Sequence, residues 1–331
     1  MSIPNLPRPA AASAFRQDFG QKFIITVDTE EEFDWRAPKS RDGYTLGSVP
    51  ALGRFQQFCE DFGVVPIYLV DYVIASSPLA AEILGPAVRE GRAEIGIHLH
   101  PWVNPPFDEI VCDANSFAGN LPPVLESEKF RLLREAIAAS FGTTPRIYRA
   151  GRYGVGPSTA AILKNNGIAI DTSVRPRYDY SDGNGPNFAR HPLHPYWLDR
   201  EHTLLELPLT TVYRGLLRRA GDRVYPRLGN LPTIRGAFAK SGLLERIALT
   251  PEGISAREAL RGIDIALDEG LPILVFSFHS PSLEPGHTPY VRCEEDLAGF
   301  YDWWRRILDH LARRGVAPTS VSDIMAAVSL A

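Results

Sequence analysis

Two histidines occupy alternate positions where an apolar run of the chain ends. Residues 94–100 read EIGIHLH, and Pro101 and Trp102 follow. In a β-strand alternate side chains point to the same face, so His98 and His100 share one face. Two imidazoles at positions i and i+2 can supply two nitrogen ligands to Zn²⁺ or a similar ion. A hydrogen-bonded pair of histidines in a packed strand end is the simpler alternative, and the pattern favours the metal site.

Carboxylates end a second apolar run, over residues 23–27. Thr26, Asp28 and Glu30 share one face of this strand, so two carboxylates lie side by side. Two such groups repel each other unless a cation or a proton lies between them. A surface acidic turn at the start of a helix is the alternative.

A third histidine and an arginine end two further runs. Ser277 and His279 share a face at the end of the run LVFSFH. With an ordinary pKa near 6.5, His279 suits a general acid, although it could equally cap the next turn. Arg149 lies two residues before Gly151. An arginine beside a catalytic carboxylate lowers the pKa of that carboxylate and fixes its orientation. A glycine allows the backbone to approach a ligand closely.

The elements that must position these residues follow an alternating pattern. Short apolar runs predict strands at 23–27, 65–70, 93–98, 146–149, 168–171, 204–207 and 273–278. Amphipathic segments predict helices at 52–62, 78–90, 127–141, 157–165 and 294–314. Strands alternating with helices indicate parallel βαβ units, and about seven units fit a closed or nearly closed barrel. No glycine-rich dinucleotide turn follows the first strand.

The domain organisation follows from the part of the chain over which strands and helices alternate. We expect one barrel over residues 21–331, preceded over residues 1–20 by a Pro- and Ala-rich arm that is flexible or draped on the barrel. A polar, turn-rich loop around 175–200 and a helical insertion rich in Arg, Gly and Leu around 213–250 interrupt the alternation. Such excursions commonly cap the mouth of a barrel.

Composition places the chain among ordinary globular proteins. It has 331 residues, 44% hydrophobic and 22% charged, with 35 Lys+Arg against 39 Asp+Glu and a net charge of -4. This balance argues against a nucleic-acid partner. Three separated cysteines form no disulfide framework. We expect neither a membrane span nor a secretory signal, and we expect a cytoplasmic protein for which a homo-oligomer is allowed.

At these places together, and in this order, the sequence resembles the polysaccharide deacetylase superfamily (NodB homology, carbohydrate esterase family 4). The resemblance runs over most of residues 22–325. Its motifs are TVDTE at 26–30, EIGIHLH at 94–100, RAGRYG at 149–154, DTSV at 171–174, LELP at 205–208 and FSFH at 276–279. The versions HLHPW and FSFHSP resemble the WalW-type subgroup.

The resemblance implies a distorted TIM-like barrel of the (β/α)7 type and metal-dependent hydrolysis of an amide bond, most simply N-deacetylation of a sugar, oligosaccharide or polysaccharide. It implies a divalent metal, with Zn first and Co, Ni or Mn as alternatives. It assigns Asp28 as the base, Glu30 as a metal ligand with Asp28 as the alternative carboxylate ligand, His279 as the general acid and Arg149 as the residue that orients Asp28. Trp102, Gly151, Tyr153 and Ser277 are the expected substrate-binding residues. The aromatic side chains of Trp102, Tyr153, Trp35 and Trp197 are equally consistent with platforms for a sugar ring and with core or lid packing.

The sequence departs from the common family pattern at three positions. Thr29 stands where the family has a second adjacent acid, and Gly151 stands where it usually has proline. The family's paired histidines are separated by three residues, which would place the second at Trp102. On the strand geometry we therefore assign the second histidine ligand to His100.

Three other functions are compatible with the same residues. A cyclic-amide or ureide hydrolase of the same superfamily would use the same metal site. A glycosidase would use two carboxylates drawn from Asp28, Glu30 and Glu206 and would need neither histidine. A non-catalytic barrel that only binds a saccharide is the third.

Overall fold

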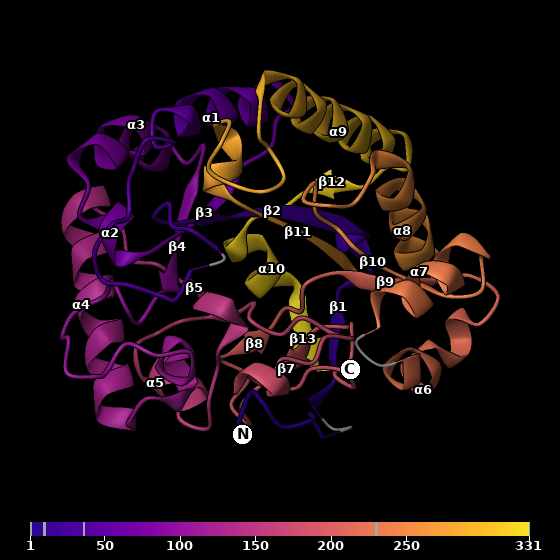
Figure 1. Cartoon of the computed structure of the whole chain (residues 1–331), viewed down its shortest axis with the longest axis horizontal. Coiled ribbons are helices and arrows are strands. Elements are labelled where there is room, and N and C mark those ends of the chain that lie inside the picture. Colours follow the sequence, from indigo (N-terminus) through magenta and orange to yellow (C-terminus); the bar gives the residue numbers. More distant parts are fainter. Residues whose placement is uncertain (1, 9–10, 36, 229–230, 331) are drawn as a thin grey trace.

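A strongly curved parallel sheet forms the centre of the protein (Figure 1). The computed structural model describes residues 2–8, 11–35, 37–228 and 231–330. Within them seven parallel strands run in the order β11-β2-β3-β4-β5-β6-β8. They are β2 (Lys22–Thr29), β3 (Ile67–Val70), β4 (Glu94–Leu99), β5 (Ile147–Ala150), β6 (Ile170–Asp171), β8 (Leu205–Glu206) and β11 (Ile273–His279). All seven expected strands are confirmed, with shifts of one or two residues at some ends.

The two edges of the sheet approach each other, so the barrel is nearly closed. After β8 the chain returns along β11, where the Thr210 N–H donates to the Val275 carbonyl at 3.4 Å and the Val275 N–H donates to Thr210 Oγ1 at 2.9 Å. The Ser277 N–H donates to the Leu249 carbonyl at 3.2 Å. Short β7 (Tyr196–Trp197) extends the other edge antiparallel to β8, and β12 (Ala317–Pro318) pairs with β2.

Helices cover the outer face of the sheet (Figure 1). They are α1 (Ala51–Asp61), α2 (Tyr72–Ala75), α3 (Pro78–Arg89), α4 (Pro123–Phe141), α5 (Thr159–Asn165), α8 (Ala256–Asp268) and α9 (Glu294–Arg313). Helix α10 (Val321–Ala327) packs instead against the inward side chains of the sheet, through Val321, Ile324 and Ala327. Short 3₁₀ turns are η2 (Gln17–Phe19), η3 (Ala114–Ser116), η4 (Ala118–Asn120), η5 (Gly151–Tyr153), η6 (Ser181–Gly183), η7 (Arg218–Ala220), η8 (Tyr225–Leu228) and η9 (Ser280–Leu283).

The alternation along β2 divides the core into two layers. Ile25 and Val27 point outward into the apolar layer between sheet and helices, where Trp304 of α9 is also buried. Ile24 points inward and packs with the apolar residues inside the barrel. Because side chains alternate, Asp28 shares the inward face with Ile24. The strand therefore directs a carboxylate into the barrel mouth.

The insertion between β8 and α8 differs from the helical excursion that we expected. It is built on an antiparallel ribbon of β9 (Thr211–Arg214) and β10 (Glu245–Ala248), and the short helices α6 (Gly221–Val224) and α7 (Pro232–Lys240) lie between the strands. A search for apolar runs in the sequence misses this ribbon because each strand has only four residues and contains an arginine. Residues 229 and 230 of this insertion lie outside the described part of the chain.

The N-terminal arm is draped over the barrel in its described part. Strand β1 (Ser13–Phe15) pairs antiparallel with β13 (Val328–Leu330), and Ile3 is fully buried. The flexibility of this arm and the single-domain reading of residues 21–331 stay predictions. No helix among the described residues is long and apolar enough to cross a membrane.

Candidate active site

A cavity of about 220 Å³ opens at the carboxyl ends of the parallel strands, where barrel folds place their sites. Most of the residues that we singled out in the sequence line it. The lining residues are Asp28, Glu30, Phe33, Trp35, Lys39, His98, His100, Trp102, Ala150, Arg152, Tyr153 and His279. The strands β2, β4 and β11 thus bring together side chains that lie up to 251 positions apart (28 to 279).

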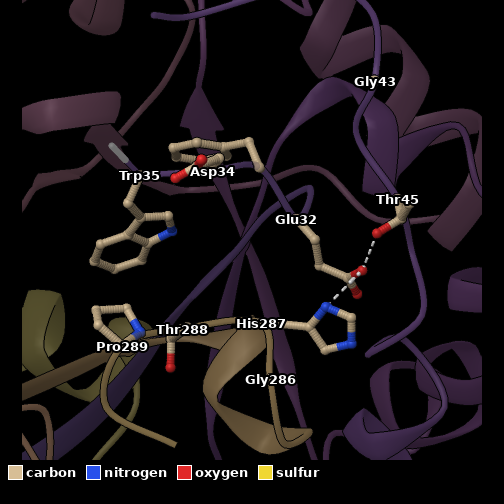
Figure 2. Close-up of a pocket in the computed structure, with 10 residues that line it drawn as sticks. Glu32, Asp34, Trp35, Gly43, Thr45, Gly286, His287, Thr288 and Pro289 are labelled. Atoms are coloured by element: carbon tan, nitrogen blue, oxygen red, sulfur yellow. Dashed lines mark hydrogen bonds and ion pairs between the residues drawn. The ribbon is translucent and has the colours of Figure 1, made fainter. Parts of the chain in front are cut away.

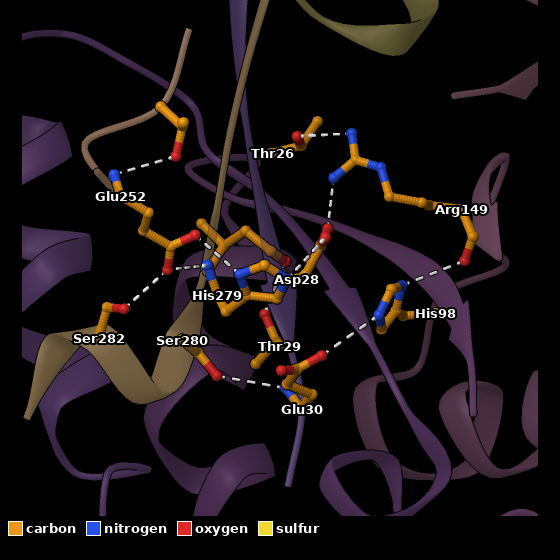
Figure 3. A network of polar contacts seen from close by, with 12 residues as sticks. Thr26, Asp28, Thr29, Glu30, His98, Arg149, Glu252, His279, Ser280 and Ser282 are labelled. Carbon is orange, nitrogen blue, oxygen red and sulfur yellow. Dashed lines mark hydrogen bonds and ion pairs between the residues drawn. The ribbon is translucent and has the colours of Figure 1, made fainter. Parts of the chain in front are cut away.

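The three expected metal ligands converge on one point. Glu30 Oε2 lies 3.4 Å from His98 Nε2 and 3.3 Å from His100 Nε2. All three side chains are buried, and each offers one nitrogen or oxygen atom within 4.8 Å of the others. Figure 3 shows the side chain of Glu30, the residue after the end of β2, directed toward His98. The spacing of the two histidines therefore aims both rings at the same place, as we expected.

The opposite edge of each imidazole is held by a hydrogen-bond acceptor. His98 Nδ1 lies 3.1 Å from the Arg149 carbonyl oxygen, and His100 Nδ1 lies 2.8 Å from Glu31 Oε2. A backbone carbonyl and a carboxylate accept only, so Nδ1 carries the proton and Nε2 presents a lone pair to Glu30. Such partners fix the tautomer of metal-binding histidines.

A supporting layer lies behind His100. Trp102 stacks on the His100 ring with centroids 4.2 Å apart and donates its indole N–H to Glu31 Oε1 at 2.8 Å. The Glu31 N–H donates to Asp71 Oδ2 at 3.0 Å, and the Ile74 N–H donates to Asp71 Oδ1 at 2.7 Å. Glu31, Asp71 and His100 also lie close enough to form a second group of metal-binding type. Because these acids have protein partners, we interpret them as support for His100.

The converging atoms fit a divalent cation. Burial lowers the pKa of His100 to about 3 and raises the pKa of Glu30 to about 7. At neutral pH His100 is therefore unprotonated, whereas Glu30 is divided between its acid and its carboxylate form. A cation bound between Glu30 and His100 would take the place of the Glu30 proton. Glu30 Oε1 is also buried without a hydrogen-bond partner. Two imidazoles and one carboxylate are a donor set that Zn²⁺ accepts.

Arg149 holds Asp28 on the neighbouring side of the cavity. Its Nη1 donates to Asp28 Oδ1, its Nη2 donates to Thr26 Oγ1 at 2.9 Å, and its Nε donates to the Thr172 carbonyl at 3.0 Å. Both members of the ion pair are buried. Burial raises the pKa of Asp28, but the guanidinium of Arg149 outweighs this effect and leaves the pKa below its ordinary value. Asp28 is therefore ionised at neutral pH.

His279 lies on the other side of Asp28, as Figure 3 shows. Its Nε2 is 3.9 Å from Asp28 Oδ2, and its Nδ1 is 2.8 Å from Glu252 Oε2. Ser282 Oγ and the His279 N–H both donate to Glu252 Oε1, at 2.7 and 3.1 Å. Burial lowers the pKa of His279, but the carboxylates of Glu252, Glu30 and Asp28 outweigh it and raise that pKa to about 10.

The expected substrate-binding residues have different surroundings. Tyr153 lines the cavity in the left-handed region with φ 60°, directly after Arg152 with φ 55°. Gly151 lies against His100: an added Cβ would stand 2.3 Å from His100 Cδ2. Trp102 lines the cavity but is only 2% exposed. Ser277 pairs with Thr26, one layer deeper than the pair of His279 and Asp28.

Two expectations need correction. Trp197 is not an aromatic platform at the mouth, because it is buried inside the barrel and donates its indole N–H to the Ser329 carbonyl at 3.1 Å. Glu206, the third carboxylate of the glycosidase alternative, is fully buried, accepts from the Val174 N–H at 3.1 Å and interacts with Asp171. Glu206 is not one of the described residues that line the cavity. Trp35 does, with its ring centroid 4.8 Å from that of His279.

Sequence reasoning missed six residues of this site. Glu31 holds the ring of His100, Glu252 holds the ring of His279, and Asp71 accepts from the Glu31 N–H. Phe33, Lys39 and Arg152 line the cavity. Glu31 could have been found, because it follows Glu30 directly in the acidic run. Glu252 lies in a turn whose sequence, TPEGIS, carries no signal of a catalytic neighbour.

A second cavity of about 510 Å³ adjoins the first (Figure 2). The two share Phe33 and Trp35 as lining residues. On the far side of the second cavity His287 Nδ1 lies 3.1 Å from Glu32 Oε2, and Glu32 also accepts from Thr45 and from the Ser48 N–H. Trp35 therefore separates the buried site from a wider polar cleft.

Comparisons with known proteins confirm the fold. No family model and no curated protein matches the sequence. Among solved structures, the chain is similar to Puue allantoinase (13% identity, TM-score 0.50, 97% of this chain and 93% of that chain). It is also similar to a GH57 branching enzyme from Thermococcus kodakaraensis (11%, TM-score 0.51, 93% and 71%). A family 4 carbohydrate esterase from Streptomyces lividans, in complex with acetate, aligns at 12% identity and TM-score 0.43 over 93% and 94%.

The alignments with TM-scores of 0.50 and 0.51 agree with the nearly closed parallel sheet. The expected (β/α)7-type barrel is therefore confirmed, and structures of family 4 carbohydrate esterases are among those that it resembles. At identities of 11 to 13% these alignments establish the fold alone.

Proposed function

We propose that this chain is a metal-dependent hydrolase of amide bonds that removes the acetyl group from an N-acetylated sugar or oligosaccharide. The observation that carries this proposal is the convergence of Glu30, His98 and His100 in one cavity with an ionised Asp28 and a protonated His279. Amide hydrolysis needs a polarised carbonyl, a base for water and an acid for the leaving amine. The cavity offers a group for each.

Glu30 Oε2, His98 Nε2 and His100 Nε2 would hold the divalent cation. When bound, the ion supplies Lewis-acid polarisation of the amide carbonyl and makes an attacking water more acidic. The protein contributes two histidines whose Nδ1 atoms are already held, so their rings need no reorientation when the ion enters. Zn²⁺ is the first choice for this donor set, with Co²⁺, Ni²⁺ or Mn²⁺ as alternatives.

Asp28 accepts the proton of the attacking water. Oδ1 is occupied by Arg149, so Oδ2, the oxygen that faces His279, is the acceptor. The contact with Arg149 fixes the orientation of the carboxylate. The same contact keeps Asp28 ionised and makes it a weak base, so the step requires a water that is already acidified.

His279 donates its Nε2 proton to the leaving nitrogen as the carbon–nitrogen bond breaks. Its Nδ1–H points to Glu252, so the ring is held with Nε2 toward the cavity. Water oxygen becomes bonded to the acyl carbon, the amine leaves with the proton, and the products are an amine and a small carboxylic acid. Glu252 acts as a positioning residue because it stabilises the protonated ring.

The two adjoining cavities fit a substrate larger than an isolated amide. The inner cavity of about 220 Å³ takes the acyl group, while the polar cleft beyond Trp35 has room for a sugar ring. An aromatic face beside carboxylate, hydroxyl and imidazole groups is a surface on which a saccharide can stack and hydrogen-bond. We propose that Trp35, which lines both cavities, contacts the sugar ring and that Tyr153, which lines the inner cavity, contacts the N-acetyl end of the substrate.

The test is acetate release from N-acetylglucosamine oligomers by protein loaded with Zn²⁺ or Co²⁺. We expect activity that a chelator abolishes and that added metal restores, and we expect none from the variant His98→Ala. A parallel assay with small cyclic amides and ureides addresses the alternative substrate class of the same superfamily. If the protein hydrolyses these cyclic compounds but releases no acetate from the sugars, its activity is ring opening of cyclic amides and the deacetylase proposal is wrong. If the protein binds saccharides but turns none over in the presence of several divalent metals, the barrel has a binding function only.

A further inference from the structure

The insertion formed by β9, β10 and the segment between them carries a charge opposite to that of the rest of the chain. Residues 211–248 contain seven arginines and one lysine against two acidic residues, a net charge of +6. The whole chain has a net charge of -4, which leaves -10 for the remaining residues. In Figure 1 this lobe, with α6 and α7, lies at one side of the barrel. Such an asymmetry indicates a surface for an anionic partner.

Part of this positive charge is free of carboxylates. Arg214 pairs with Glu245 at 3.0 Å, and Arg218 pairs with Glu269 at 2.8 Å. Four other basic side chains of the lobe are exposed, and none of them forms an ion pair with a described carboxylate: Arg219, Arg223, Arg227 and Lys240. Their charge is available to an external partner.

The same lobe exposes large aliphatic side chains. Leu216 is 84% exposed, Leu231 55%, Ile234 40% and Leu217 36%. They are not needed for the lobe's own core, which consists of Tyr213, Tyr225 and Leu244 with Val224, Leu228 and Phe238 packed against them. Leu231 and Ile234 lie at the start of α7, whereas the Leu216 N–H donates to the Gly242 carbonyl just beyond its end.

We propose that this lobe binds the surface of a membrane that contains anionic phospholipids. Exposed leucines among unpaired arginines are the composition of interfacial anchors, in which the apolar side chains enter the headgroup region and the cations contact phosphate groups. A nucleic acid would engage the arginines but would gain little from four exposed aliphatic side chains. The charge and the apolar exposure together therefore favour a lipid surface. This inference does not depend on the proposed hydrolysis.

Co-sedimentation with lipid vesicles tests the proposal. The full chain is mixed with vesicles of phosphatidylcholine alone and with vesicles that also contain phosphatidylglycerol. We expect binding to the anionic vesicles only, and we expect the bound fraction to fall as salt is added, because salt screens exposed charges. A fluorescent DNA duplex is the competing polyanion in a separate titration.

Two matched sets of variants locate the surface. The triple change of Arg219, Arg223 and Arg227 to Gln should weaken vesicle binding about a hundredfold, because each basic residue near an anionic surface contributes about a factor of five. Its control changes three exposed arginines outside the lobe to Gln: Arg89, Arg257 and Arg306. The control should bind like wild type.

The second set removes apolar side chains. Leu216→Ser with Leu231→Ser should weaken binding, whereas Ile110→Ser with Val124→Ser, at sites 80% and 83% exposed outside the lobe, should not. The proposal is overturned by the absence of vesicle binding, by equal losses in the variants and their controls, or by equal binding to neutral vesicles. DNA binding that is lost with the arginines but unaffected by the leucine changes would also overturn it.

Discussion

Replacing Gly151 by alanine should move a metal-binding side chain by a distance that the structure defines. A Cβ at this position would stand 2.3 Å from Cδ2 of His100 and 2.6 Å from the Leu99 carbonyl oxygen. Ordinary carbon–carbon contacts begin at about 3.5 Å, so the imidazole ring and the backbone must separate by about 1 Å. Displacements of that size at a catalytic group cost about a hundredfold in rate.

The effect should appear first in metal affinity. His100 is held between Trp102 on one face and Glu31 at Nδ1, so it cannot retreat without loosening its support. Loss of such support costs about ten- to a hundredfold in affinity. We expect Gly151→Ala to lower metal affinity by that factor, measured by chelator competition, and to lower kcat/KM about a hundredfold, measured by acetate release.

Gly299→Ala in α9 is the matched control, since an added Cβ meets no atom within 4 Å there. It should leave metal affinity unchanged and should stabilise the fold by about 0.5–1 kcal/mol through helix propensity. Unchanged metal affinity in Gly151→Ala, with a melting temperature close to wild type, would refute the close approach of Gly151 to His100.

Two further predictions concern the partners of His279 and Asp28. Burial lowers the pKa of His279 and the carboxylate of Glu252 raises it, so Glu252→Gln should lower that pKa from about 10. The protonated form of His279 is then lost at lower pH, and the alkaline limb of the kcat/KM profile should shift to lower pH. An unchanged alkaline limb would contradict the role of Glu252. Arg149→Met should destabilise the fold by about 3–5 kcal/mol in urea unfolding because it leaves Asp28 buried without its cation. Adding Asp28→Asn should recover part of that loss, and equal stabilities of the single and double variants would argue against the ion pair as the cause.

The strands that carry the site could be predicted from sequence because they are buried on both faces. β2 reads KFIITVDT and β11 reads ILVFSFH, and such apolar runs stand out without an alignment. The period of two also places His98 and His100 on one face, and it separates the inward Asp28 from the outward Val27. Periodicity thus determines which side chains enter the barrel.

The elements outside the parallel sheet have weaker signals. The ribbon of β9 and β10 is short and arginine-containing, and β1 and β13 pair over three residues each. Helix α8 carries an unused signal, a capping box in which Ser255 and Glu258 bond reciprocally. Trp197 illustrates a signal that is ambiguous, because an aromatic residue near turn residues is equally compatible with a substrate platform and with a core position.

The partners of the catalytic groups depend on tertiary structure. Glu252 meets His279 because β10 returns the chain to the free edge of β11, which no local pattern encodes. Asp71 reaches the site through the N–H of Glu31, at the carboxyl end of the adjacent strand β3. Residues of this kind become visible only when neighbouring strands are placed side by side.

The direct test of the central claim is the metal content and coordination of the purified full chain. X-ray absorption spectroscopy at the edge of the bound metal should show one divalent ion per chain, with two imidazole nitrogens and a carboxylate oxygen among its ligands. His98→Ala and His100→Ala should each lose the ion, while Ser277→Ala, one layer below the site, should keep it. A wild-type chain that binds no divalent ion after incubation with Zn²⁺, Co²⁺, Ni²⁺ and Mn²⁺, or one whose ion survives both histidine changes, would contradict the account.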